Sequence, residues 1–151
     1  MNGAAPVPGV PAPELILPDQ YGSTFVLSEA SRESAVLLVF YPFAFSPVCG
    51  REMSLLTDLA RTGELGGGIR AVGISVDSKY TLAAWSREAG IGIELLSDFW
   101  PHGAAAQTYG VFDEQRGAAR RGTFLIDTHG IIQRAETGPV DRVRDLASWL
   151  H

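Results

Sequence analysis

Apolar runs and amphipathic segments alternate along most of the chain. Ala35–Tyr41 is a continuous apolar run of strand length, which is typical of a strand buried on both faces of a sheet. Ile69–Ser75 is a second candidate for such a strand, and Ile93–Leu96 is a third, shorter one. Ala104–Tyr109 has the length of one or two helical turns. Strand and helix signals therefore alternate through the middle of the chain.

Two longer helices are predicted between these strands. Ser46 has the side chain of an N-cap and precedes a proline, which fits the first helical position, so the first helix should cover Pro47–Thr62. The second should cover Lys79–Ala89, with Asp77–Ser78 available as its cap. A glycine follows each segment and marks its end. Apolar residues repeat at helical spacing over Val140–Leu150, so we expect the chain to close with an amphipathic helix.

Two β-hairpins are predicted at turns that contain both Asp and Gly. Asp19–Gly22 forms the first turn and Asp127–Gly130 forms the second. Alternating strands and helices, followed by a hairpin and a helix, predict an α/β fold. We expect a thioredoxin-like three-layer sandwich, in which a central mixed sheet has helices on both faces and is preceded by an N-terminal β-hairpin. The hairpin strands are Glu14–Leu17 with Ser23–Leu27, and Thr123–Ile126 with Ile131–Ala135.

The composition fits one globular domain. The chain has 151 residues, 46% of them hydrophobic and 19% charged, and this length suffices for a single apolar core. Residues 1–13 contain four prolines and no basic side chain, so we predict a flexible lead-in there and a single domain over 14–151. The lead-in lacks the basic start and apolar run of a secretory signal, and no run of about 18 apolar residues predicts a membrane span. We therefore expect a cytoplasmic protein.

Charge and cysteine content exclude several classes of function. The net charge of −5 counts against nucleic-acid binding, which needs a basic face. The single cysteine, Cys49, rules out an internal disulfide, a Cys-x-x-Cys redox pair and a multi-cysteine zinc site. The histidines His102, His129 and His151 do not have metal-ligand spacing. We expect neither a metal nor a cofactor.

Cys49 is the candidate for covalent chemistry. With Ser46 as the N-cap, Cys49 takes the third position of a helix, where unpaired backbone N–H groups and the helix dipole favour an anion. Thiols in such positions ionise more readily than free cysteine. Taken alone, the residue could equally be a small buried hydrophobic side chain without a chemical role.

Glu52 lies on the same helical stripe as Cys49. The stripe is apolar and faces the core, where a lone carboxylate is costly. Glu52 therefore either lies at the solvated edge of the stripe or needs a cation. Arg120 and Arg121, which precede the apolar run Thr123–Ile126, are the candidates. An arginine shared between Glu52 and the sulfur would hold the thiolate and aim hydrogen-bond donors at it.

The residues around Cys49 resemble the signature of the peroxiredoxins. Pro42, Ser46, Cys49 and Glu52 match the pattern Pro-x-x-x-(Thr/Ser)-x-x-Cys-x-x-Glu, which in that family follows a buried strand and opens a helix. The likeness covers nearly the whole chain, and within the family it is greatest to the one-cysteine AhpE-type alkyl hydroperoxide reductases of the AhpC/TSA superfamily. Further matching segments are Ser97–Gly103, Tyr109–Phe112 and Arg121–Asp127.

This resemblance implies roles for the matching residues. Cys49 would be the peroxidatic cysteine, whose thiolate attacks a peroxide oxygen and becomes a sulfenic acid. Ser46 and Arg121 would donate hydrogen bonds to the peroxide oxygens, together with the backbone N–H groups of Val48 and Cys49. Considered without the family, Ser46 could be a simple helix cap and Arg121 a surface charge.

Pro42 and Glu52 take supporting roles in the same resemblance. Pro42 would cover the sulfur and exclude water, although a proline at this place also simply ends a strand. Glu52 would orient the arginine. Between the two arginines, the Arg-Gly-Thr-Phe context favours Arg121 over Arg120.

Two departures from the family pattern shape the expected reaction cycle. Ser46 stands where most members have Thr, which keeps the hydroxyl. Ser54 stands where a related type often has a resolving cysteine, so an external thiol must reduce the sulfenic acid. That thiol would be a low-molecular-weight thiol or a glutaredoxin-like or thioredoxin-like protein.

The resemblance implies a thiol-dependent peroxidase that reduces hydrogen peroxide, organic hydroperoxides and peroxynitrite. The alternative is a non-catalytic redox-sensing or interaction module that uses the same cysteine. The family also commonly forms homodimers through the edge near the cysteine. Phe43, Phe45 and Trp100 could line such an interface or a hydroperoxide-binding surface, although aromatic residues are more often part of the core.

Overall fold

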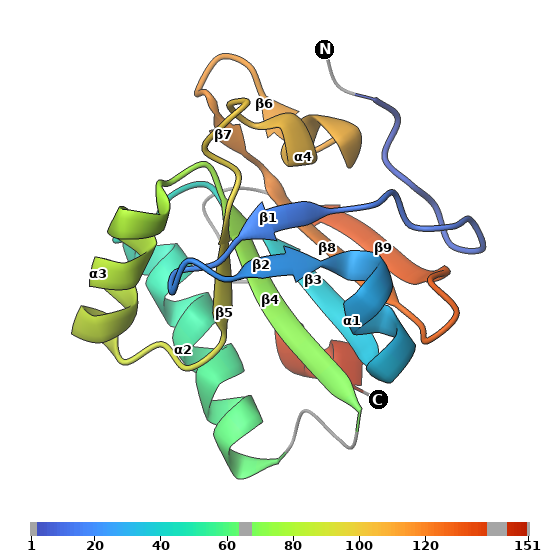
Figure 1. The fold of residues 1–151 in the computed structure, drawn as a ribbon, viewed down its shortest axis with the longest axis horizontal. Coiled ribbons are helices and arrows are strands. Elements are labelled where there is room, and N and C mark those ends of the chain that lie inside the picture. Colours follow the sequence, from blue (N-terminus) through green and yellow to red (C-terminus); the bar gives the residue numbers. More distant parts are fainter. Residues whose placement is uncertain (1–2, 64–67, 139–144, 151) are drawn as a thin grey trace.

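A five-stranded mixed sheet lies at the centre of the computed structural model, which describes residues 3–63, 68–138 and 145–150 (Figure 1). In sheet order, the strands are β5 (Glu94–Ser97), β4 (Ile69–Ser75), β3 (Ala35–Phe40), β8 (Arg121–Ile126) and β9 (Ile132–Gly138). β5, β4 and β3 run parallel to one another, whereas β8 is antiparallel to β3 and β9 is antiparallel to β8. The predicted mixed sheet is confirmed.

β3 is buried on both faces, as its apolar sequence predicted. Successive side chains of a strand point to opposite faces of the sheet. Val36, Leu38 and Phe40 belong to one hydrophobic cluster, whereas Leu37 and Val39 belong to the other. All five side chains are fully buried. The sheet therefore separates two apolar cores, and other elements must cover each face.

The N-terminal hairpin and two short helices cover one face (Figure 1). β1 (Ile16–Pro18) pairs antiparallel with β2 (Thr24–Val26), which confirms the predicted hairpin. β2 leads directly into α1 (Leu27–Glu33), and α4 (Ala104–Thr108) packs on the same core. The sequence prediction was wrong at Leu27, which it assigned to the second strand, and it contained no α1. A helix of seven residues has too few apolar repeats for periodicity to reveal it.

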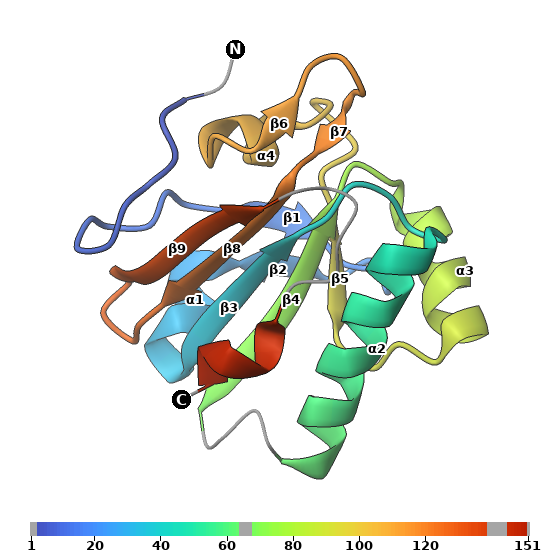
Figure 2. The same cartoon turned by 180° about the vertical axis from the view of Figure 1, so that it is seen from behind.

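Two longer helices cover the opposite face (Figure 2). α2 (Pro47–Thr62) and α3 (Lys79–Ala89) both have the predicted bounds. The 3₁₀ helix η1 (Leu146–Leu150) packs beside α2 and is the described part of the amphipathic helix predicted over Val140–Leu150. The remainder of that prediction, residues 140–144, lies outside the described residues. With helices on both faces of the sheet, the molecule is the predicted three-layer α/β sandwich.

Residues 3–13 lie against the domain. The Gly3 N–H donates to the Gln107 carbonyl of α4 at 2.9 Å, and the Gly9 N–H donates to the Ile132 carbonyl of β9 at 2.8 Å. The sequence predicted a flexible lead-in, and in the structure backbone N–H groups of this segment donate to carbonyl oxygens of α4 and β9. The flexibility of the segment stays a prediction.

A small hairpin and an extended β8 follow α4 in the chain. β6 (Phe112–Asp113) pairs antiparallel with β7 (Ala118–Ala119). β8 then begins at Arg121, two residues before the start that the sequence predicted. Its register pairs Gly122 with Phe40 of β3. Antiparallel neighbours on both sides extend the strand through an Arg-Gly pair whose composition does not favour a strand. Arg121 therefore lies beside the carboxyl end of β3, where the chain turns toward α2.

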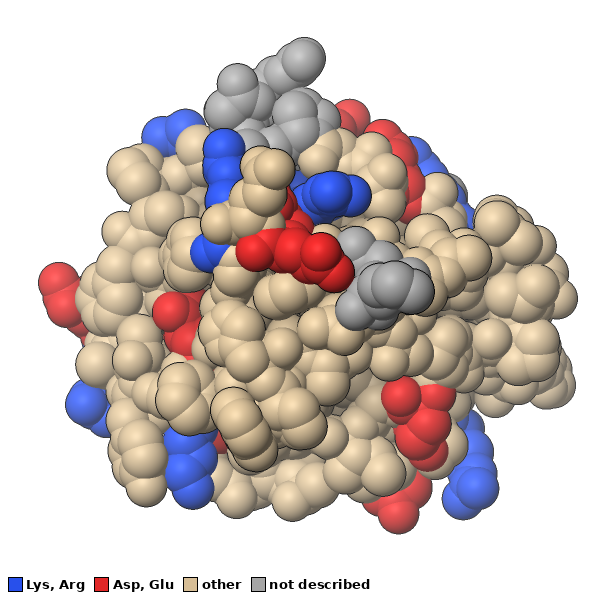
Figure 3. Space-filling view, turned by 90° about the horizontal axis from the view of Figure 1, so that it is seen from above, with Lys and Arg blue, Asp and Glu red and all other residues tan. Residues whose placement is uncertain are grey.

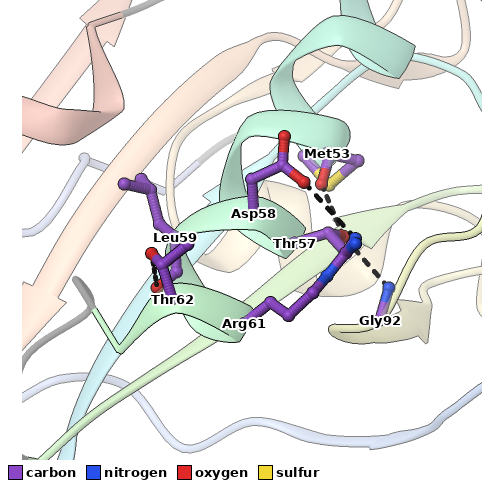
Figure 4. Close-up of polar contacts among 7 residues, drawn as sticks. All are labelled: Met53, Thr57, Asp58, Leu59, Arg61, Thr62 and Gly92. Carbon is purple, nitrogen blue, oxygen red and sulfur yellow. Dashed lines mark hydrogen bonds and ion pairs between the residues drawn. The ribbon is translucent and has the colours of Figure 1, made fainter.

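Thr57 ties α2 to the segment that enters β5 (Figure 4). Its hydroxyl donates to the Met53 carbonyl at 2.8 Å and accepts from the Gly92 N–H at 3.0 Å. The bond to the Met53 carbonyl is buried, and the bond from the Gly92 N–H is partly buried. Arg61 and Asp58 form an ion pair of 3.3 Å on the same helix, but both are exposed and the pair adds little stability. α2 is therefore fixed at its middle by Thr57.

Candidate active site

Cys49 lies in the first turn of α2, at the third helical position, as predicted. The helix begins at Pro47, and Ser46 before it has the extended backbone of an N-cap residue, with φ −84° and ψ 147°. The N–H groups of a first helical turn have no acceptors within the helix, so this end of α2 carries partial positive charge. The Cys49 side chain is fully buried. Its sulfur therefore lies in an environment that favours a negative charge.

The guanidinium of Arg121 contacts this sulfur directly. Nη1 and Nη2 of Arg121 both lie 3.3 Å from Sγ of Cys49. Only 3% of Arg121 is exposed, so water does not screen the contact. A planar fork of N–H donors interacts more strongly with a thiolate than with a neutral thiol. The structure thus brings together two residues that are 72 positions apart in the sequence.

Glu52 holds the other side of the guanidinium. Its Oε1 accepts a hydrogen bond of 2.8 Å from Nη1 of Arg121, and no part of Glu52 is exposed. Cys49 and Glu52 share a face of α2 because they are three residues apart. A carboxylate in such a place needs a paired cation. The solvated alternative for Glu52 is therefore excluded, and one arginine bridges the thiol and the carboxylate.

Arg120 and Arg121 were both candidates for this pairing, and the structure places only Arg121 in it. Neighbouring residues along an extended chain point in opposite directions. Arg120 is exposed, and its N–H donates to the Val111 carbonyl. Arg121 is the first residue of β8 and points into the buried site.

The Ser46 side chain does not cap α2, which corrects the expectation from sequence. Its hydroxyl donates to the Phe43 carbonyl at 3.1 Å, and among the described residues no helix N–H donates to it. The residue type and the backbone fit an N-cap, but the side chain turns back onto the loop before the helix. The half-buried hydroxyl can therefore rotate toward a ligand without the loss of a helix cap.

Pro42 is buried in the loop that joins β3 to α2. The Tyr41 N–H still donates to the Ile74 carbonyl of β4 at 3.1 Å. Pro42 has no N–H and ends this pairing, so the chain leaves the sheet and turns toward Cys49. The cover that Pro42 would form over the sulfur stays a prediction.

Sequence reasoning missed Asp77 and Tyr41, two polar residues next to this loop. The Asp77 carboxylate accepts from the Ala44 N–H at 2.7 Å. The sequence offered Asp77 as a cap for α3, but Ser78 does this by accepting from the Thr81 N–H at 3.2 Å. Tyr41 is fully buried, and burial raises the pKa of its phenol. The available signal was the position of Asp77 just beyond β4, since parallel neighbours end at the same edge of a sheet.

The described residues contain no group of three or more His, Cys, Asp or Glu side chains arranged to hold a metal ion. His102 is exposed and hydrogen-bonds the Gly117 carbonyl at 2.6 Å through Nε2, and His129 is exposed in the β8–β9 turn. Within the same described part of the chain, no helix combines the length and apolar character needed to cross a bilayer.

Comparison with known families agrees with this geometry. The profile of the AhpC/TSA family matches residues 8–135, which is most of the chain. The chain belongs to the AhpC/TSA family. Because this AhpC/TSA protein has a single cysteine, it is a one-cysteine peroxiredoxin, as its sequence signature implied.

Several named AhpC/TSA relatives resemble the chain over much of its length. Alkyl hydroperoxide reductase E of Mycobacterium tuberculosis, and the protein of the same name in Mycobacterium bovis, are each 43% identical over 141 residues. The matched region covers 93% of this chain and 92% of each relative. Rat peroxiredoxin-2 is 36% identical over 125 residues, which cover 77% of this chain and 62% of that protein.

Solved structures of peroxiredoxins share the fold. Peroxidoxin BcpB from Mycobacterium tuberculosis superposes with a TM-score of 0.82 at 30% identity and covers 96% of both chains. The reduced 2-Cys peroxiredoxin of Plasmodium vivax gives a TM-score of 0.83 at 28% identity, over 95% of this chain and 78% of that one. The thioredoxin-like architecture predicted for this AhpC/TSA chain is confirmed.

Proposed function

We propose that Cys49 is the residue that reduces hydroperoxides in this peroxiredoxin, and that Arg121, Glu52, Ser46 and Pro42 serve that reaction. Thiol peroxidase activity follows from the family and the single cysteine. The observation that carries the assignment of residues is the contact of both Arg121 Nη atoms with the sulfur, locked by Glu52.

The chemical step transfers one oxygen to the sulfur. The Cys49 thiolate attacks the terminal oxygen of R–O–O–H, the O–O bond breaks, and the electron pair of that bond leaves with RO⁻. The products are the sulfenic acid S–O–H and an alkoxide, which takes a proton from water to give the alcohol. With hydrogen peroxide, the leaving group is hydroxide and the second product is water.

Arg121 acts on the transition state more than on the acidity of the thiol. Greater acidity raises the thiolate fraction but lowers its nucleophilicity, so it accelerates attack by only a few-fold in thiol chemistry. The larger gain must come from donors aimed at the charge that develops on the leaving oxygen. In this proposal, Arg121 and the hydroxyl of Ser46 supply them, joined by the first-turn N–H groups of Val48 and Cys49.

Access to the sulfur requires a small movement of its cover. Cys49 has no exposed surface, so a peroxide reaches it only when neighbouring side chains shift. Pro42 and Ser46 stand in the loop before α2, and Ser46 is only half-buried. The same cover would exclude water and a second peroxide between turnovers, which limits over-oxidation.

An external thiol completes the cycle. Ser54 occupies the position where a related type often carries its resolving cysteine, and the chain has no second cysteine. A thiol R′SH condenses with the sulfenic acid to give a mixed disulfide and water. A second thiol then attacks the mixed disulfide, which releases the Cys49 thiol and forms R′S–SR′. A small thiol, a glutaredoxin-like protein or a thioredoxin-like protein can each fill this role.

Stopped-flow oxidation of the reduced protein tests the proposal. Tryptophan fluorescence reports the reaction, and hydrogen peroxide, an alkyl hydroperoxide and peroxynitrite are compared. The wild-type protein is expected to react far faster than free cysteine, and Cys49→Ser is expected not to react. A wild-type rate no greater than that of free cysteine would overturn the proposal. Failure of any added thiol to sustain turnover would favour the sensor alternative.

The neighbouring arginine provides a matched control. Arg121→Ala should slow oxidation far more than it shifts the pH at which the thiolate ultraviolet absorbance appears. Arg120→Ala removes an equal charge from the exposed neighbouring position and should leave the rate unchanged. Equal effects of Arg121→Ala on rate and on ionisation would refute the transition-state role.

We also infer that the chain forms a homodimer through the loops next to Cys49. The carboxyl ends of β3, β4 and β5 meet at one edge of the sheet, and the loops that follow β3 and β5 expose aromatic rings. The molecule seen from above is mainly uncharged, with charged side chains in small separate groups (Figure 3). A second copy would cover the rings, and Trp100→Glu should then shift a sedimentation profile from dimer to monomer. A wild-type monomer would refute this. The exposed rings are Phe43, Phe45, Phe99 and Trp100.

A cytoplasmic location belongs to the same proposal. It rests on the single cysteine, which suits a reducing compartment. Such a compartment also supplies the thiols that the cycle consumes. Fractionation of cells that express the natural protein tests the location directly.

A further inference from the structure

Asp77 links the loop before α2 to the central sheet. Its Oδ2 accepts hydrogen bonds of 2.7 Å from the Ala44 N–H and 2.7 Å from the Ser75 hydroxyl. Its backbone carbonyl accepts a further bond of 2.6 Å from the Ser97 hydroxyl. Ser75 ends β4 and Ser97 ends β5. One residue therefore joins the ends of two parallel strands to the loop that leads to Cys49.

The loop needs such an anchor because its backbone is strained. Phe45 has a φ of 66°, in the left-handed region that a residue with a Cβ adopts at a cost. Strain of this kind persists only where surrounding contacts hold the backbone in place. The Ala44 N–H, one residue earlier, is held by Asp77, and the Phe45 ring packs on Trp85 with centroids 6.2 Å apart. This conformation sets the direction in which α2 begins.

Tyr41 fills the space beneath the same contacts. It is fully buried, its ring lies 5.6 Å from that of Trp85, and among the described residues its hydroxyl has no hydrogen bond of good geometry. The Ser75 hydroxyl and the Asp77 carboxylate both lie close enough to act on the phenol, whose pKa is raised mainly by burial. The side chains that pack under the loop are thus mainly apolar, and Asp77 is the polar group among them that hydrogen-bonds the loop backbone.

We propose that Asp77 is a positioning residue for the peroxidase reaction, which it serves by holding the Ala44 N–H and with it the loop that carries Pro42 and Ser46 into the start of α2. This inference rests on the proposed function. Asp77 acts through the loop backbone, whereas Arg121 contacts the sulfur from β8 and Glu52 holds that arginine from α2. The two sets of contacts approach Cys49 from separate elements, so one can be removed without the other.

Asp77→Ala tests the proposal. Loss of a hydrogen bond to a charged acceptor should slow the reaction of Cys49 with hydrogen peroxide by about ten- to a hundredfold. Alkylation of Cys49 by iodoacetamide needs the thiolate but no peroxide-binding donors, so it should not be slowed. Asp77→Asn keeps an oxygen that can accept from the Ala44 N–H, and it should restore most of the peroxide rate.

Asp127→Ala is the matched control. The Asp127 carboxylate also accepts backbone N–H groups in a turn, from His129 at 2.8 Å and from Ile131 at 3.0 Å. That turn follows β8 at the opposite end of the sheet, because the Ile126 end of β8 pairs with the start of β3. Asp127→Ala should lower the urea midpoint without slowing the reaction with peroxide.

Three results would overturn the role of Asp77. They are an unchanged peroxide rate in Asp77→Ala, equal slowing of alkylation and of peroxide reduction, and an Asp77→Asn variant as slow as Asp77→Ala. If Asp77→Ala does not fold, Asp77→Ser replaces it, since its side chain is one bond shorter and does not reach Ala44. The same slowing is expected.

Hydrogen exchange of the Ala44 amide separates this inference from the proposed function. The exchange, followed by NMR in the absence of peroxide, should be faster in the Asp77 variant and unchanged in Asp127→Ala. Unaltered exchange would overturn the anchor even if the wild-type protein is a fast peroxidase. A wild-type protein as slow as free cysteine would overturn the proposed function even if the exchange behaves as expected.

Discussion

The Glu52–Arg121 pair makes a strong prediction because both groups are buried. Arg121→Met removes the guanidinium and leaves the Glu52 carboxylate, which has no exposed surface, without its 2.8 Å partner. Breaking a buried ion pair from one side costs about 3–5 kcal/mol. The free energy of unfolding of a domain of this kind is about 5–15 kcal/mol. The variant should therefore fold but lose a large part of its stability.

A double-mutant cycle isolates the pair. Urea unfolding of the reduced protein at neutral pH, followed by tryptophan fluorescence, gives the free energy of unfolding of each variant. Glu52→Gln removes the charge that Arg121 pairs with, so the double variant should be more stable than the sum of the two single losses implies. We expect an interaction energy of about 1–3 kcal/mol. The exposed neighbour gives the control, since Arg120→Met should stay within about 0.5 kcal/mol of the wild type.

Single losses that add to within about 0.5 kcal/mol would show that the pair does not interact and would refute the reasoning.

Three further predictions concern single side chains. Ser46→Ala should slow oxidation by hydrogen peroxide about tenfold and Ser46→Thr should not; equal rates in stopped flow would exclude the hydroxyl as a donor. Thr57→Val removes the bonds to the Met53 carbonyl and the Gly92 N–H and should cost about 1–3 kcal/mol in urea unfolding, with the peroxide rate unchanged. Burial raises the pKa of Asp98 to about 6. The folded state thus binds its proton more tightly than the unfolded state, whose carboxyl has a pKa near 3.9. The resulting stabilisation is complete below about pH 4 and is lost as the pH rises through about 6. Asp98→Asn should lack this loss when urea midpoints are compared across the range, and identical profiles would contradict the assignment.

Much of the architecture could be predicted because the pattern of apolar residues along a segment indicates which of its faces are buried. The apolar run that became β3 has no polar position to face water, and it proved to be the central strand between two cores. α2 and α3 had clear starts and glycine ends, and both kept their predicted bounds. α1 was missed because seven residues carry little periodicity, and β8 began early because its two neighbouring strands, not its own composition, extend it.

The sequence alone determined that a single thiol stands in the first turn of a helix, with a carboxylate one turn later on the same face. It also limited the partner of that carboxylate to two adjacent arginines. These features follow from spacing within one helix, which the chain specifies locally. The family resemblance already favoured Arg121 over Arg120, and the tertiary structure supplies the physical reason, because the strand register points Arg121 inward and leaves Arg120 exposed. The tertiary structure also turned the Ser46 hydroxyl onto the loop and brought Asp77 to the Ala44 N–H. Side-chain direction and contacts between distant segments depend on how strands pair and pack, and no local pattern in the chain encodes them.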